Sequence, residues 1–152
     1  MSAQVAAWLG QTPADPDVGQ SEGYPWHIER ARVGSSRRVP LEVVVNGHAV
    51  QRRDVVADGC FRAMTFEIDV PRSSWVALRI LPSAHTAPIV VSVAGQPARA
   101  SRRSARWCLN CIDVLWDKHA RRIRDAERPA AAAAWDHACA TYQKIISECP
   151  AD

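Results

Sequence analysis

The segment RWCLNCIDVLWDKH, residues 106–119, gathers side chains that can bind a metal or carry out redox chemistry. Cys108 and Cys111 stand three positions apart, and two aspartates and a histidine follow them. Cys139 and Cys149 lie further along the chain. A zinc site and a reactive thiol pair are the two chemistries that this set of residues suggests, and simple packing of thiols is the alternative.

The spacing of these residues argues against both kinds of site. Zinc needs about four ligands that converge tetrahedrally, usually from two short pairs, whereas Cys108 and Cys111 form one pair inside a predicted helix. A redox pair lies at a helix N-terminus, but Cys108 lies more than a turn inside. We therefore expect the cysteines to pack as small apolar groups, without a metal or cofactor. His119 is expected in the core, and Asp113 and Asp117 on the solvated side.

After Ser101 the apolar residues recur with the period of an α-helix. The predicted stripe of the first helix, flanked by Leu109 and Trp116, is Ala105, Cys108, Ile112, Leu115, His119 and Ile123. Its polar side is Arg106, Asn110, Asp113, Asp117, Arg121 and Arg124. A second helix is predicted to follow Asp125 as N-cap, with Pro129 in its first turn. Its predicted stripe is Ala131, Trp135, Ala138, Cys139, Tyr142, Ile145, Ile146 and Cys149.

Between Trp26 and about Val93 the hydrophobic period is two, which indicates short β-strands. The dipeptides Asn46-Gly47 and Asp58-Gly59 predict tight turns between them. The predicted strands are WHIERARV, LEVVV, AVQRRDVVA, MTFEIDV, SWVALRIL and PIVVSV. In MTFEIDV the inward residues are Met64, Phe66, Ile68 and Val70.

The strand SWVALRIL is apolar on both faces, with Val76, Leu78 and Ile80 on one and Trp75, Ala77 and Leu81 on the other. A strand of this kind is covered on both faces, so the helical hairpin is expected to lie across one sheet. The predicted fold class is α+β: an antiparallel Ig-like β-sandwich followed by a C-terminal two-helix hairpin packed on one sheet.

Three segments are predicted along the chain. Residues 1–24 are expected to be a tether, in which SAQVAAWLG makes a short helix anchored by Trp8. Residues 25–100 form the sandwich, and residues 101–150 form the hairpin appended to the same domain.

Bulk composition excludes several classes of protein. At 152 residues and 47% hydrophobic content the chain can bury a real core. A net charge of +3 is too mild for a nucleic-acid-binding face. No apolar stretch approaches the roughly 20 residues that span a bilayer. The odd number of cysteines favours reduced thiols and a cytoplasmic location, with export as the alternative if an N-terminal part is missing.

Arginines crowd the start of the first predicted helix, where the helix dipole favours negative charge. Ser101 is a good N-cap, but Arg102, Arg103 and Arg106 occupy the first turns. Either an acidic neighbour or a bound anion must compensate them, so these four residues are a candidate anion site or domain interface.

Three further polar groups could form a cluster or an interface. His27 and Glu29 share one side of the first predicted strand. Arg79 interrupts an apolar face and needs a carboxylate partner there. His85 and Thr86, in the loop before Pro88, could face a partner or a cleft.

The chain carries no recognisable catalytic motif. It has no Gly-x-Ser-x-Gly elbow, no phosphate-binding glycine loop and no His-x-His pair. We therefore expect that this chain alone is not an enzyme and has no catalytic residue.

Four stretches together resemble a known family: YPWHIERARVGSSRRVPLEVVVNG, VVADG, RSSWVALRILPSAHTAPIVV and PARASRRSARWCLNCIDVLW. They are similar to the C-terminal region of bacterial metal-dependent hydrolases of the CehA/McbA type, in the polymerase-and-histidinol-phosphatase (PHP) superfamily. The similarity runs from about Tyr24 to Cys149. The phrases around Ser74-Trp75 and around residues 85–88 are its most distinctive part.

The resemblance implies a non-catalytic accessory domain. In such proteins the metal ligands lie in a preceding catalytic domain, and none of those motifs is present in this chain. The implied partner is therefore a metal-dependent hydrolase catalytic domain, in cis or in trans. This domain would pack against the catalytic domain or form one wall of its active site. The alternative is a free-standing Ig-like module that binds protein or carbohydrate through Trp26 or Trp75. A homo-oligomer is compatible with both.

Overall fold

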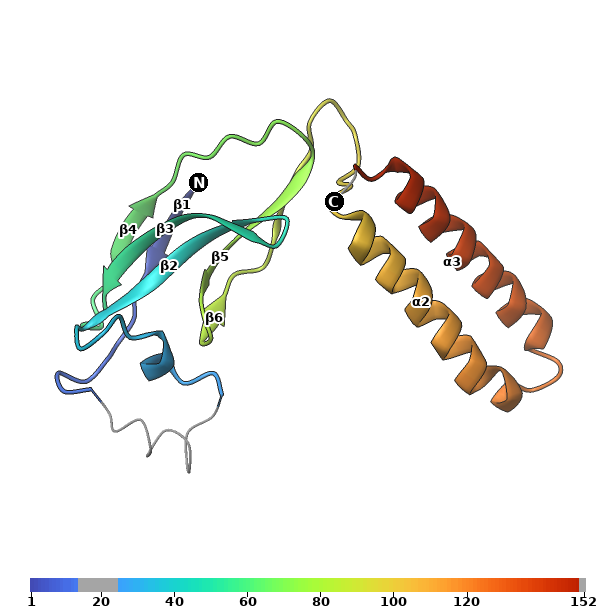
Figure 1. Ribbon diagram of the computed structural model, residues 1–152, viewed down its shortest axis with the longest axis horizontal. Coiled ribbons are helices and arrows are strands. Elements are labelled where there is room, and N and C mark those ends of the chain that lie inside the picture. Colours follow the sequence, from blue (N-terminus) through green and yellow to red (C-terminus); the bar gives the residue numbers. More distant parts are fainter. Residues whose placement is uncertain (14–24, 151–152) are drawn as a thin grey trace. The chain divides into compact units, whose positions relative to one another are not determined.

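The protein is described by a computed structural model that places residues 1–13 and 25–150 (Figure 1). The chain divides into two compact units, Met1–Ala98 and Arg99–Asp152. We call them the sheet unit and the helical unit and describe each by itself. In the described residues no helix is long and apolar enough to cross a membrane.

The larger sheet has five antiparallel strands in the order β3-β2-β5-β6, with β7 also paired to β5. Its strands are β2 (Arg38–Val45), β3 (His48–Val56), β5 (Ser74–Ile80), β6 (Ala84–His85) and β7 (Ile89–Val91). The predicted turn at Asn46-Gly47 joins β2 to β3, and both of its residues have positive φ, 50° and 93°. That backbone conformation is the one that a two-residue hairpin turn requires.

A smaller sheet pairs β1 (Ser2–Val5) with β4 (Arg62–Thr65). The prediction of a helix in SAQVAAWLG, within a tether, is wrong for these residues. Met1, Ala3, Val5, Ala7 and Leu9 alternate inward and belong to or pack on the core, so the segment is extended, with a strand at Ser2–Val5 and an isolated bridge from Trp8 to Asp58. Trp8 is not an anchor, because 65% of its surface is exposed. The rest of the predicted tether, residues 14–24, lies outside the described residues.

One hydrophobic core draws side chains from both sheets. Val39, Leu41 and Val43 of β2 and Val76, Leu78 and Ile80 of β5 alternate into it. Phe66 is completely buried there although β4 ends one residue earlier. The predicted inward set of MTFEIDV is therefore confirmed, while the strand itself is shorter than predicted.

The segment WHIERARV forms a 3-10 turn, η1 (Ile28–Ala31), and not the predicted strand. Local polar bonds favour the turn. The His27 ring accepts a hydrogen bond from the Glu29 amide at 3.2 Å, and the Glu29 carboxylate takes two bonds of 2.6 Å from Arg32. A partner three residues away is within reach on a helical turn and out of reach along a strand.

The helical unit contains α2 (Arg102–His119), the short η2 (Ala120–Arg122) and α3 (Arg128–Glu148), with α2 and α3 packed together. The predicted stripe of α3 is confirmed, since each of its members is shielded from solvent at least in part. The N-cap of α3 is Glu127 and not Asp125, because the preceding turn, with Glu127 N bonded to Arg124 O at 2.9 Å, extends to that residue.

The predicted stripe of α2 is displaced. Trp116 stacks on Trp135 of α3 with ring centroids 5.4 Å apart, which centres the contact on Leu109, Ile112 and Trp116. Leu115 and His119, both predicted to face inward, are exposed. As a whole, the chain is an α+β protein with antiparallel sheets of five and two strands, followed by two packed helices.

Candidate functional site

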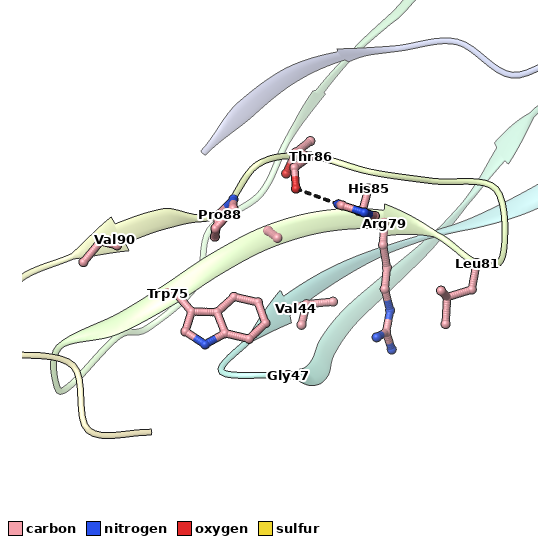
Figure 2. Close-up of a pocket in the computed structure, with 10 residues that line it drawn as sticks. Val44, Gly47, Trp75, Arg79, Leu81, His85, Thr86, Pro88 and Val90 are labelled. Atoms are coloured by element: carbon pink, nitrogen blue, oxygen red, sulfur yellow. Dashed lines mark hydrogen bonds between the residues drawn. The ribbon is translucent and has the colours of Figure 1, made fainter. Parts of the chain in front are cut away.

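The outer face of the larger sheet carries an apolar groove of about 570 Å³. It is lined by Val44, Gly47, Trp75, Ala77, Arg79, Leu81, His85, Thr86, Pro88 and Val90. Figure 2 shows the side chains of Val44, Trp75, Arg79 and Leu81 projecting to the same side of β2 and β5. Val44 and Ala77 are buried at its floor, whereas Leu81 and Val90 are 54% and 69% exposed.

Pairing of β2 with β5 builds the groove floor. The register sets Val44 beside Ala77 and Glu42 beside Arg79. The carboxylate that we expected beside Arg79 is Glu42, whose Oε2 accepts from Arg79 Nε at 2.7 Å. Both side chains are partly buried, at 27% and 20% exposure. The pair carries no net charge, so the groove is apolar with a neutral polar edge.

The hairpin turn between β2 and β3 holds Trp75 at one end of the groove. Asn46 binds the strand through three bonds: its amide donates to Trp75 O at 3.0 Å, its Oδ1 accepts from Trp75 N at 3.1 Å, and its Nδ2 donates to Ser74 Oγ at 3.0 Å. A Cβ at Gly47 would lie 3.9 Å from the Trp75 ring. The turn therefore fixes the backbone that carries the indole.

Thr86 also lines the groove and lies in the segment between β6 and β7. Its amide donates to Leu78 O at 2.9 Å, and its Oγ1 accepts from Leu78 N at 3.1 Å. The threonine hydroxyl thus takes the place of a strand carbonyl. Next to it, His85 Nδ1 lies 3.1 Å from the Thr86 carbonyl oxygen.

We expect Thr86→Val to lower the free energy of unfolding by about 1–3 kcal/mol, because the buried Leu78 amide then has no acceptor. Thr86→Ser, which keeps the hydroxyl, is the matched control and should cost less. Urea denaturation of the three proteins measures the difference. Equal stability of the valine variant and the parent would contradict this role of Thr86.

The arginines at the start of α2 meet the C-terminal end of α3. Ser101 is the N-cap, with its Oγ accepting from Ser104 N at 3.1 Å. Arg102 donates to the Cys149 carbonyl at 2.8 Å, and Arg99 pairs with Glu148 at 2.7 Å. Cations at a helix C-terminus are favourable, so the end of α3 compensates the charge of Arg102 that α2 itself disfavours. Arg103 and Arg106, the other two candidates, have exposed side chains.

Two cysteines of the helical unit have polar neighbours on the other helix, Cys108 beside Tyr142 and Cys139 beside Asp113. A hydrogen bond between Tyr142 and the Cys108 thiol raises the pKa of the phenol. Burial, followed by the nearby Asp113 carboxylate, raises the pKa of the Cys139 thiol. A raised thiol pKa lowers the thiolate fraction and hence the reactivity. In the residues that the structure describes, no group of three or more His, Cys, Asp and Glu side chains is arranged to hold a metal ion.

The other polar residues singled out from the sequence do not form one cluster but lie at two separate positions. Arg79, His85 and Thr86 all line the groove, whereas His27 and Glu29 do not. His27 and Glu29 are used locally, in η1, as described above. Sequence reasoning missed Glu42, Val44, Asn46 and Gly47, because only the pairing of β2 with β5 brings them to the groove.

Comparisons of the chain with protein families, with curated protein sequences and with solved structures found no match.

Proposed function

We propose that this chain is a non-catalytic accessory domain that docks onto the catalytic domain of a PHP-type metal-dependent hydrolase, in cis or in trans. One observation carries the proposal. Eight of the ten residues that line the groove lie between Trp75 and Val90. The same stretch, RSSWVALRILPSAHTAPIVV, holds the most distinctive part of the resemblance to CehA/McbA-type hydrolases.

The chemistry of the groove supports a protein surface as its occupant. Its floor and walls are largely apolar, and the charge of Arg79, which lines it, is neutralised by the neighbouring Glu42. Such a surface gains free energy from burial of apolar area and has no excess charge with which to hold an ion. Apolar patches of this kind on a soluble domain mark interaction sites.

The proposal also includes a more detailed description of the fold and of the location of the protein. The two sheets are the layers of an Ig-like sandwich, whose common core draws on both. The packing of the helical hairpin on one sheet remains a prediction from the sequence. A cytoplasmic location fits reduced thiols, since the five cysteines are all free.

The test is binding of the purified chain to the catalytic domain of a CehA/McbA-type hydrolase, measured by isothermal titration calorimetry. We expect binding, and we expect Val90→Glu to weaken it at least about tenfold, because a carboxylate would replace an exposed apolar side chain that lines the groove. Val50→Glu is the matched control, because Val50 is 50% exposed on β3 and does not line the groove.

Two results would count against the proposal. One is the absence of binding to any catalytic domain of this type. The other is equal weakening by Val90→Glu and Val50→Glu, which would place the contact elsewhere. Binding of a carbohydrate at the groove would instead support the alternative of a free-standing binding module.

A further inference from the structure

We draw no further inference here: the strongest candidate, the exposed apolar patch on α2 formed by Trp107, Val114 and Leu115, carries no proposal because nothing in the part of the chain that the structure describes shows what covers it.

Discussion

Leu9→Ala should lower the free energy of unfolding by about 2–5 kcal/mol, the usual cost of removing a large buried aliphatic side chain. Leu9 is 1% exposed and belongs to the core of the sheet unit. Its amide donates to Ala57 O at 2.9 Å, which ties the segment to the region after β3. A domain of this size is stable by about 5–15 kcal/mol, so the variant should lose a large part of that margin.

The adjacent Trp8 is the matched control, because its side chain is 65% exposed. Trp8→Ala should cost about 1 kcal/mol or less. Chemical denaturation of both variants distinguishes two structures for the N-terminal segment. In one the segment is extended and contributes to the core, and in the other it is a tether anchored by its tryptophan. A larger loss for Trp8→Ala than for Leu9→Ala would contradict the strand.

Phe66→Ala is expected to cost about 3–5 kcal/mol, the typical range for a buried aromatic residue. Phe66 is completely buried, and the Arg53 guanidinium carbon lies 4.7 Å from its ring centroid. Its backbone also extends the pairing of β1 with β4 by one residue, since Phe66 N donates to Met1 O and the Met1 ammonium donates to Phe66 O, both at 2.8 Å. Alanine would leave a cavity at the centre of the core.

The chain offers a control in its only other phenylalanine, Phe61, which is 77% exposed. Phe61→Ala should change stability by about 0.5 kcal/mol or less. Thermal and urea unfolding of the pair measure the contrast. Similar losses for both variants would mean that Phe66 is not the centre of the core.

The N-terminal strand shows why part of the fold escaped prediction. Inward residues alternate from Met1 to Leu9, but Ala6 and Trp8 on the outward side are also apolar and obscure the period of two. The residue types Ala, Gln and Leu favour a helix. Pairing with β4, more than 50 residues away, overrides that preference.

The alternation of the strand at residues 74–81 was predicted correctly, because that information is local. The two faces of β5, with Val76, Leu78 and Ile80 on one and Trp75, Ala77 and Leu81 on the other, follow directly from the alternation and are observed. The partner of Arg79 did not follow, because it depends on the register between β2 and β5. Register is a property of the folded sheet and is not contained in either strand alone.

The arginines of α2 illustrate the same limit in the helical unit. Their position at a helix N-terminus indicated that something negative must be nearby. For Arg102 the partner proved to be the Cys149 carbonyl at the end of α3, while the adjacent Glu148 pairs with Arg99, just before α2. Only the antiparallel packing of the two helices brings that end close.

We propose that the groove at Trp75–Val90 is the surface that contacts a hydrolase catalytic domain. Hydrogen–deuterium exchange of the full chain, alone and mixed with a CehA/McbA-type catalytic domain, tests it most directly. We predict that added protection is concentrated in residues 74–91 and at the Asn46-Gly47 turn. No change in exchange on mixing, or protection confined to other segments, would contradict the claim.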